Sequence, residues 1–404
     1  MTVTFTDVIA ARDRQDDEDI VQHTPIEVSR SLSEMSGGTV YLKMEHLQRT
    51  GSFKTRGAYN KLSQLAEAGE VDTVIAASAG NHAQGVAICA RSLGLNATIV
   101  MPEFAPQTKV DATRGYGAEV ILEGSDFPAA MEHAKSLDDE STAFIHAFND
   151  PDIVAGQGTL GLEIAEDLPN VDTVLVPIGG GGLISGVAVA LSEQLPDTRV
   201  VGVQAADAAT VHESLEKGFP MALESMRTFA DGIETGGVSE LTLGLIEKHV
   251  DEVVTVTDGE IATAVLVLLE RAKQLVEGAG AAPVAALLGE DLDVTGETVL
   301  PVLTGGNFSI VELQWVLSHA LSQRQQVVPL RIRIEDKPGE LHHLSGIIAD
   351  TGANVRTVRH DRAVEDLDVG EAYMTFNVET SGISHTNSII EAIREEGYPV
   401  QRRT

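Results

Sequence analysis

The chain of 404 residues has a single cysteine, Cys89, which excludes an intramolecular disulfide framework. Aromatic residues are also few, at 4%, although hydrophobic residues as a whole make up 43% of the sequence. We therefore expect cores built mainly from Ala, Val, Leu and Ile, and we do not expect a disordered chain. The length exceeds what one compact domain usually needs, so more than one domain is expected.

Basic residues are scarce. Only 9 lysines and 19 arginines stand against 61 acidic residues, and the net charge is -33. Such a charge repels nucleic acid and anionic membrane surfaces, so neither is expected as a partner. The acids are spread along the chain, which indicates a solvated surface and not a binding tail. Scarce lysine beside abundant Asp and Glu is typical of a halophilic protein, whose salt-rich cytoplasm screens the self-repulsion.

We also find no pattern in the sequence that is typical of a targeting segment or of a membrane span. Residues 1–19 carry acids where a signal peptide needs basic residues and a hydrophobic stretch. The longest uncharged run, residues 174–191, contains a proline and four successive glycines. That run fits a strand, a loop and the start of a helix better than a membrane span. We expect a soluble, cytoplasmic protein.

Apolar strands alternate with helical patterns over much of the chain. The strand-like segments are residues 73–79, 97–102, 118–124, 172–178 and 198–205. Near-continuous apolar strands separated by helices predict parallel sheets with both faces covered, and thus an α/β fold. After residue 326 the order becomes βαββαβ, which predicts a small ferredoxin-like unit over residues 327–404. The predicted domains are therefore residues 1–326 and 327–404.

Four successive glycines, Gly179 to Gly182, follow one of these strands and precede an amphipathic helix. Glycine lets the main chain turn its N–H groups onto an anion, and the helix N-terminus adds a favourable field. The alternative is a flexible turn, but a turn rarely needs four glycines. The spacing matches neither the dinucleotide-binding pattern nor the Walker A pattern. We therefore expect this loop to bind the phosphate of some other ligand.

Polar side chains lie in three further segments. Main-chain N–H groups between Ser78 and His82 can hold a carboxylate, and Asn81 can donate to a ring oxygen. Thr304 follows an apolar strand and can offer its hydroxyl to a heteroatom, and Lys54 can form a Schiff base with an aldehyde cofactor. Each has a simpler interpretation, as a helix cap, a packed histidine, a turn or a surface lysine. Taken together they describe a pyridoxal phosphate site.

Several stretches, in this order along residues 20–320, closely resemble the threonine dehydratases (threonine ammonia-lyases), which are tryptophan-synthase-β-like, type II pyridoxal phosphate enzymes. The stretches are KMEHLQRTGSFKTRGA, ASAGNHAQGVA, AGQGTLGLEI, VPIGGGGLISG, EGAGAAPVAAL and LTGGN. Residues 327–404 resemble an ACT domain, a common amino-acid-sensing module. The resemblance implies two parallel-sheet subdomains, with a smaller one of about residues 46–150 inserted in the larger, followed by the ACT domain.

The resemblance also implies a role for individual residues. Lys54 would be the catalytic Schiff-base lysine, with Phe53 against the cofactor. Asn81 would bond the pyridoxal ring oxygen, and Thr304 would face the pyridine nitrogen. The phosphate loop would consist of Gly179, Gly180, Gly181, Gly182 and Leu183. The substrate carboxylate would be held by Ser78, Ala79, Gly80 and His82.

The implied activity is that of a threonine ammonia-lyase (EC 4.3.1.19), which converts L-threonine to 2-oxobutanoate and ammonia and feeds isoleucine biosynthesis. The alternatives are a serine/threonine dehydratase with a degradative role, and a non-catalytic amino-acid sensor on the same scaffold. The implied assembly is a homodimer or homotetramer. An amino-acid effector, with isoleucine expected, would bind the ACT unit near Pro338, Gly339, Glu340, Leu341 and Asn354.

Four positions depart from the pattern of the family. Thr304 replaces the usual serine and keeps the hydroxyl. Ala79 stands where serine racemases, which are close relatives, carry an acid–base serine, so racemisation is not expected. Gln204 and Thr210 replace the acids with which some relatives bind a divalent cation, so we expect no metal.

Overall fold

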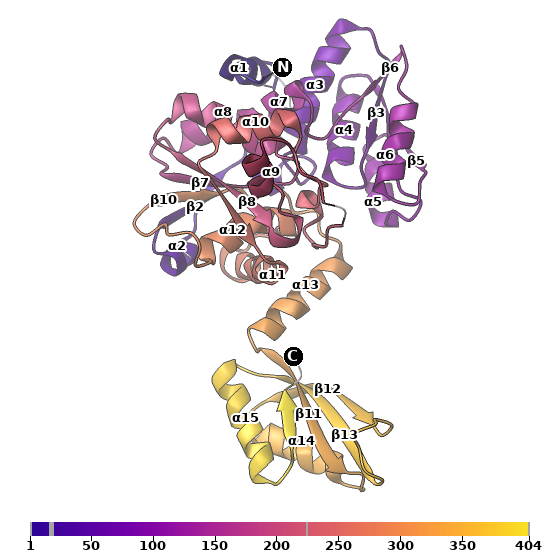
Figure 1. The fold of residues 1–404 in the computed structure, drawn as a ribbon, viewed down its shortest axis with the longest axis vertical. Helices are drawn as coiled ribbons and strands as arrows, with labels where there is room; N and C mark the ends of the chain where they lie inside the picture. Colours follow the sequence, from indigo (N-terminus) through magenta and orange to yellow (C-terminus); the bar gives the residue numbers. More distant parts are fainter. Residues whose placement is uncertain (1, 16–19, 224, 403–404) are drawn as a thin grey trace. The chain divides into compact units, whose positions relative to one another are not determined.

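The chain forms two compact units, Met1–Ser309 and Ile310–Thr404. The computed structural model describes residues 2–15, 20–223 and 225–402 (Figure 1). Within these ranges, no helix has the length and apolar character that crossing a membrane requires. The predicted division into domains after residue 326 stays a prediction, as do the bounds of the inserted subdomain.

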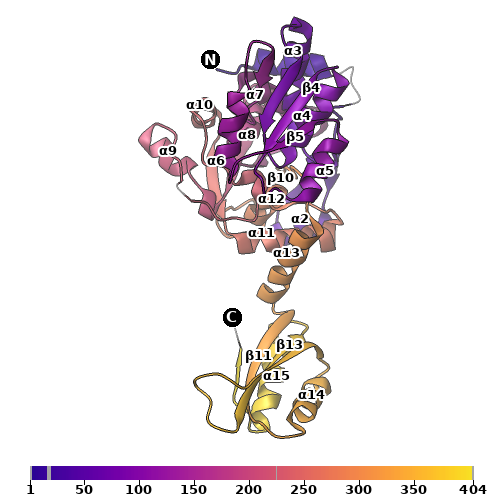
Figure 2. The ribbon, with the colours of Figure 1, turned by 90° about the vertical axis from the view of Figure 1, so that its right-hand side faces the viewer.

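One sheet of the first unit has four parallel strands in the order β5-β4-β3-β6. In that order, these strands are Glu119–Leu122, Asn96–Met101, Thr73–Ala77 and Thr142–Phe144. The helices of this part of the chain are α3 (Lys54–Ala68), α4 (Asn81–Ser92), α5 (Gln107–Gly115) and α6 (Phe127–Ser136) (Figures 1 and 2). The last four residues of β3 are buried, as expected for a strand covered on both faces.

The other sheet of the first unit has six strands in the order β1-β2-β10-β7-β8-β9. They are Ile26–Val28, Thr39–Lys43, Thr298–Pro301, Thr173–Pro177, Arg199–Ala205 and Glu252–Val256. All neighbours are parallel except β1 and β2. The helices are α1 (Phe5–Gln15), α2 (Arg30–Ser36), α7 (Pro151–Asp167), α8 (Gly182–Gln194), α9 (Val211–Lys217), α10 (Glu240–His249), α11 (Asp258–Val267) and α12 (Gly278–Leu288). The parallel sheets confirm the fold class predicted for this part of the chain.

Helices α7 and α8 pack closely because glycines face each other. A Cβ atom on Gly186 would lie 2.3 Å from the main-chain oxygen of Val154 and 2.6 Å from the nitrogen of Gly158. Real Cβ atoms do not approach so closely, so the helices would have to separate. Since α8 begins at Gly182, this contact also fixes the glycine loop that precedes it.

The second unit begins with α13 (Ile310–Gln323) and contains one antiparallel sheet in the order β12-β13-β11-β14. Its remaining elements are β11 (Val327–Glu335), α14 (Glu340–Asp350), β12 (Asn354–Asp361), β13 (Glu371–Glu379), α15 (Ile383–Glu395) and β14 (Val400–Arg402). Exposure alternates along β11, so one face of the sheet joins a core with α14 and α15. The element order is the predicted βαββαβ.

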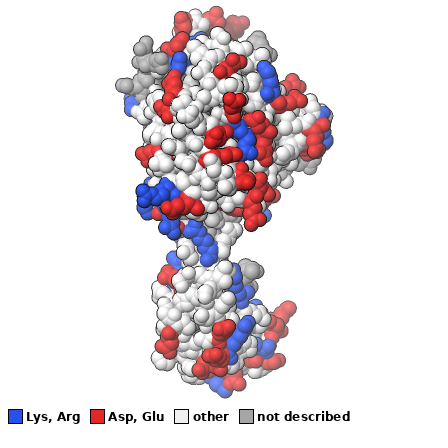
Figure 3. All heavy atoms as spheres, turned by 90° about the vertical axis from the view of Figure 1, so that its left-hand side faces the viewer, with Lys and Arg blue, Asp and Glu red and all other residues white. Residues whose placement is uncertain are grey.

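The acidic side chains on one face of the molecule are dispersed. Figure 3 shows Asp and Glu spread over one face of the molecule, with Lys and Arg between them. On this face, the distribution agrees with a solvated surface and not with a single acidic binding patch.

Replacing Gly186 with alanine should lower the free energy of unfolding by about 1–3 kcal/mol, because the added methyl group overpacks the contact between α7 and α8. Urea denaturation measures the effect. Gly244→Ala is the matched control, since a Cβ at this helical position meets nothing within 4 Å. The control should be more stable by about 0.5–1 kcal/mol. Equal stability of the two variants would contradict this account of the packing.

Candidate active site at the ends of the parallel strands

Lys54 is the first residue of α3, and the segment before it is tied to the loop after β10. The main-chain nitrogen of Phe53 donates to the oxygen of Thr304 at 3.2 Å, and Ser52 forms an isolated bridge with Gly305. The ammonium of Lys54 lies 4.9 Å from the centroid of the Phe53 ring. The structure therefore brings Lys54, Phe53 and Thr304 together, although Lys54 and Thr304 lie 250 positions apart in the sequence.

The surroundings of Lys54 favour its neutral amine. Burial lowers the pKa of Lys54 to about 8, although the charge of Glu277 acts in the opposite direction. An amine with this pKa is neutral far more often near pH 7 than an ordinary surface lysine. Desolvation of this kind is one of the ways in which proteins activate a lysine as a nucleophile.

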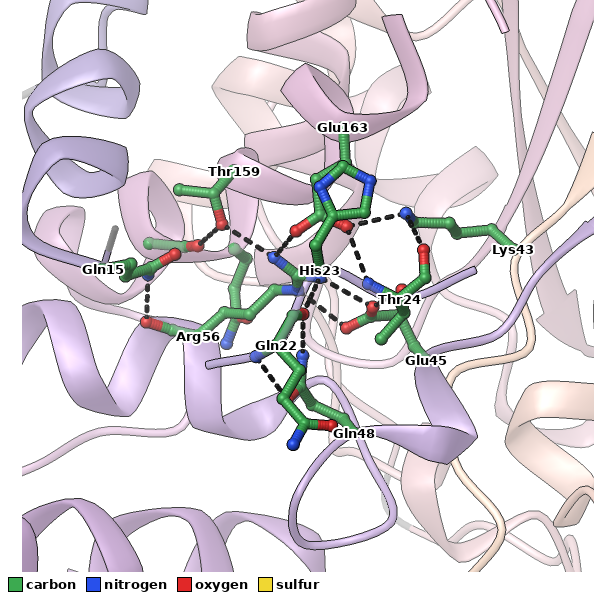
Figure 4. A network of polar contacts seen from close by, with 12 residues as sticks. Gln15, Gln22, His23, Thr24, Lys43, Glu45, Gln48, Arg56, Thr159 and Glu163 are labelled. Carbon is green, nitrogen blue, oxygen red and sulfur yellow. Dashed lines mark hydrogen bonds and ion pairs between the residues drawn. The ribbon is translucent and has the colours of Figure 1, made fainter. Parts of the chain in front are cut away.

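The first turn of α3 is anchored by the buried side chain of Arg56 (Figure 4). Its Nε and Nη2 donate to the two carboxylate oxygens of Glu45, each at 2.8 Å, and its Nη1 donates to Glu163 at 2.6 Å. Lys43 donates to the other oxygen of Glu163 at 2.6 Å. Burial alone would raise the pKa of Glu163, but Arg56 and Lys43 hold it below its ordinary value. We call these four residues the Arg56 cluster.

The glycine loop forms a cradle between β7 and α8. Gly181 has a φ of +85°, and α8 begins at Gly182. Among the described residues, none accepts a hydrogen bond from the main-chain N–H groups of Gly179 to Gly182. A Cβ on Gly180 would lie 2.2 Å from the ring of Phe148, so the loop has no room for a larger residue there. Successive free N–H groups at a helix N-terminus form a site suited to a phosphate.

Asn81 begins α4, directly after β3, and both ends of its amide are held. Its Nδ2 donates to Glu277 at 2.7 Å, and its Oδ1 accepts a hydrogen bond from Nδ2 of Asn307 at 2.7 Å. Glu277 and Asn307 were not among the residues singled out from the sequence. Both belong to stretches that carry the family resemblance, EGAGAAPVAAL and LTGGN, which is the signal that pointed to this region.

In the segment from Ser78 to His82, the main chain offers N–H groups to a ligand, whereas the His82 side chain does not. The Ser78 hydroxyl accepts a hydrogen bond from the nitrogen of Gly80 at 3.1 Å, while the N–H groups of Ala79, Asn81 and His82 find no acceptor among the described residues. Those N–H groups can hold a carboxylate. The His82 side chain instead contacts the main-chain oxygen of Ile145 at 3.0 Å, so it packs inside the protein.

His82 is an unsuitable proton donor near neutral pH. Burial lowers its pKa to about 3, and the nearby charge of Lys54 adds to this effect. The imidazole is therefore neutral in ordinary buffers. The predicted contacts of Ser78 to His82 with a substrate stay a prediction, as do the other predicted roles of site residues.

Gln204 caps the turn before α9. Its Oε1 accepts hydrogen bonds from the nitrogens of Thr210 at 3.2 Å and Val211 at 3.0 Å. The Gln204 amide, one of the two residues from which the sequence led us to expect no metal binding, thus has a structural role. Over the described ranges, no group of three or more His, Cys, Asp or Glu residues is arranged to hold a metal ion. The expectation of no metal stays a prediction.

Residues 18–305 match the family described as "Pyridoxal-phosphate dependent enzyme". The chain belongs to this family. It is 46% identical over 385 residues to an L-threonine ammonia-lyase of Thermotoga maritima, a match that covers 95% of this chain and 96% of the relative. It is 44% identical to an L-threonine ammonia-lyase of Geobacter sulfurreducens, over 94% and 95% of the two chains.

A solved structure agrees with the fold. The processed form of threonine deaminase isoform 2 from Solanum lycopersicum superposes with a TM-score of 0.75 and is 36% identical. That match covers 78% of this chain and 93% of the other. The first unit therefore has the α/β fold of the type II pyridoxal phosphate enzymes, with parallel sheets, as the sequence predicted.

The residues present fit the cofactor of the family. The glycine loop offers free N–H groups to a phosphate, and Lys54 offers an amine of lowered pKa to an aldehyde. Asn81 keeps one amide hydrogen beyond the one donated to Glu277, and the hydroxyl of the buried Thr304 lies in the loop that bonds to Phe53. Pyridoxal phosphate is thus the cofactor of this enzyme.

Replacing Glu45 with glutamine should lower the free energy of unfolding by about 3–5 kcal/mol, because it removes one charge of the buried Arg56 cluster and leaves Arg56 undercompensated. Glu213→Gln is the control. It breaks an exposed pair with Lys217 and should change stability by less than about 1 kcal/mol. The two variants are compared by urea denaturation in the same salt, and losses of equal size would contradict the importance assigned to the cluster.

The lowered pKa of Lys54 predicts how its reactivity depends on pH. In cofactor-free protein, labelling of Lys54 by an acid anhydride should reach half its maximal rate near pH 8, because only the neutral amine reacts and its pKa is about 8. Mass spectrometry of the Lys54 peptide measures the label, and Lys54→Ala identifies its signal. A midpoint near pH 10, as for an ordinary lysine, would show that the site does not activate the amine.

Proposed function

We propose that this protein is a pyridoxal-phosphate dependent L-threonine ammonia-lyase. It eliminates water from threonine, and the enamine that results takes up a water and breaks down to 2-oxobutanoate and ammonia. The observation that carries this conclusion is Lys54, an amine of lowered pKa next to the segment that bonds the Thr304 loop, in a fold with a free glycine cradle. The charge of Glu277, which accepts a hydrogen bond from Asn81, acts on the same amine. The relatives named L-threonine ammonia-lyase match nearly the whole chain, which supports the same substrate.

Different residues of the site would hold different parts of the cofactor and of threonine. Gly179 to Leu183 would hold the cofactor phosphate, Asn81 the ring oxygen and Thr304 the ring nitrogen. The free N–H groups of Ala79, Asn81 and His82 would hold the carboxylate of threonine. When bound, pyridoxal phosphate supplies an electron sink for the bond that breaks at the substrate Cα.

Lys54 is the group that moves protons. With a pKa of about 8, its neutral amine can take the proton from Cα near the working pH, which is the condition for effective general base catalysis. Thr304 presents a hydroxyl and not a carboxylate, so it does not stabilise a proton on the ring nitrogen. A neutral partner favours rapid elimination over long-lived carbanion chemistry such as transamination.

A racemase activity is disfavoured by this arrangement. Ala79 has no group that can exchange a proton from the side opposite Lys54. His82, the next titratable group along the segment, is neutral and bonded to the main chain of Ile145. Loss of the β-hydroxyl is therefore the expected outcome.

The degradative alternative is not favoured. The two threonine ammonia-lyase relatives match 95% and 94% of this chain, so their similarity extends into the C-terminal unit. A second unit beside the catalytic unit is what we expect of an enzyme that is regulated, as a biosynthetic enzyme is. Preference for threonine over serine still depends on one methyl group, which is worth about 1–3 kcal/mol in a pocket.

The proposal includes a regulatory role for the C-terminal unit as an ACT domain that binds isoleucine and makes the enzyme allosteric. The antiparallel sheet and the βαββαβ order support it. Glu340, at the start of α14, accepts a hydrogen bond from the hydroxyl of Tyr398 at 2.7 Å, and Asn354 donates to Glu379 at 3.1 Å. The effector is proposed to bind around the turn from Pro338 to Leu341 and Asn354.

We also propose that the enzyme works as a homodimer or homotetramer in the salt-rich cytoplasm of a halophile and feeds isoleucine biosynthesis. The net charge of -33 supports the salt-rich setting, since dissolved ions screen repulsion between acidic surfaces.

The proposed activity is tested by mixing purified protein with L-threonine and pyridoxal phosphate in concentrated potassium chloride. Wild type should release 2-oxobutanoate, and Lys54→Ala should lose at least a thousandfold in kcat, because it removes the proton-transferring amine. Added isoleucine should alter the dependence of rate on threonine concentration. A protein that binds the cofactor but releases no 2-oxo acid would contradict the proposal, and one that binds no cofactor would favour the sensor.

A further inference from the structure

Glu277 connects two parts of the active site, the start of α4 and the loop after β10. Its main-chain nitrogen donates to the oxygen of Gly305 at 2.9 Å, which ties it to the loop that carries Thr304. One carboxylate oxygen accepts from Nδ2 of Asn81 at 2.7 Å, and the other accepts from the main-chain nitrogen of Asn307 at 3.0 Å. The carboxylate therefore links the start of α4 to the loop after β10.

Asn307 completes the arrangement. Its Nδ2 donates both to Oδ1 of Asn81 and to the main-chain oxygen of Thr50, each at 2.7 Å. The amide of Asn81 is therefore held in one orientation. If it were turned over, its oxygen would face the carboxylate of Glu277 and its nitrogen would face the amide nitrogen of Asn307.

The neighbouring glycines leave room for these two side chains. A Cβ on Gly305 would lie 2.3 Å from Oε1 of Glu277, and one on Gly51 would lie 2.5 Å from Oδ1 of Asn307. Since Gly51 also has a φ of +74°, another residue would be strained there as well as crowded. The local main chain is thus shaped around the contacts that hold Asn81.

We propose that Glu277, together with Asn307, is a positioning residue that fixes the Asn81 amide so that its second Nδ2 hydrogen is directed to the cofactor. The inference rests on the proposed function, because it assigns the ligand of Asn81 as the pyridoxal ring oxygen. An Asn81 amide free to turn would present its oxygen to the ring oxygen for part of the time, which is repulsive. Held by Glu277, it presents only a donor.

Glu277→Gln tests this role with a small change of shape. The glutamine oxygen can still accept from Asn81, but its NH2 group then faces the N–H of Asn307 and cannot accept from it. We expect the Kd of pyridoxal phosphate for cofactor-free protein to rise about threefold to tenfold, the usual effect of one lost hydrogen bond. The absorbance maximum of the bound cofactor and the pH at which it changes should shift too.

Two further variants separate positioning from general damage. Asn307→Ala removes the partner of the Asn81 oxygen and should weaken cofactor binding in the same direction. Glu297→Gln is the matched control. Glu297 accepts from the hydroxyl of Thr173 at 2.7 Å and precedes β10, at the end of the strand opposite Thr304. This control should leave the Kd and the absorbance of the bound cofactor unchanged.

A double-mutant cycle with Asn81→Ala decides whether Glu277 acts through Asn81. In the Asn81→Ala background, Glu277→Gln should change the Kd of pyridoxal phosphate by less than about twofold, because the amide to be oriented is gone. A full effect in that background, or no effect of Glu277→Gln in the wild type, would overturn the inference while leaving the proposed function intact. Wild-type protein that binds no pyridoxal phosphate would overturn both.

Discussion

The structure depends on the pairing of Arg56 with Glu45 and Glu163 inside the first unit. The Arg56 side chain is almost wholly buried, and a buried guanidinium is tolerated only where charges and hydrogen bonds compensate it. The cluster joins β2, the short helical turn after it, α3 and α7, which are far apart in the sequence. Lys54 lies two residues before Arg56 on the same helical turn. The position of the reactive amine is therefore set by charges on the opposite side of its helix.

The second constraint is the direction of the strands. Asn81 follows β3, the glycine loop follows β7, and Thr304 follows β10. In parallel sheets the carboxyl ends of the strands lie at one edge, where ligands of α/β proteins commonly bind. Each strand is therefore followed by a different group. The residue after β3 is a donor for a ring oxygen, the loop after β7 is a cradle for a phosphate, and the loop after β10 carries a hydroxyl. Glu277 then connects Asn81 to the loop that carries Thr304 by hydrogen bonds, and its charge acts on Lys54.

Much of this arrangement could be predicted from the sequence, because the signals are local. Apolar segments such as residues 73–79 and 172–178 predicted buried parallel strands, and four glycines after a strand predicted an anion site. Glu277 could not be found in that way. It lies 196 positions from Asn81, and neither residue alone is unusual. The position of β10 between β2 and β7 could not be predicted either, because tertiary packing determines the strand order and the hydrophobic pattern of each strand does not. The same holds for the Arg56 cluster, since an arginine in a charged protein is ordinarily at the surface.

The central claim is that Lys54 is the residue that bonds to the cofactor. The most direct measurement is borohydride reduction of the protein loaded with pyridoxal phosphate, followed by digestion and mass spectrometry of the lysine peptides. The account predicts one pyridoxyl group, on the peptide that contains Lys54, and none on that peptide after Lys54→Ala. A label on another lysine, or an unlabelled Lys54 peptide from protein that retains the cofactor, would contradict the account.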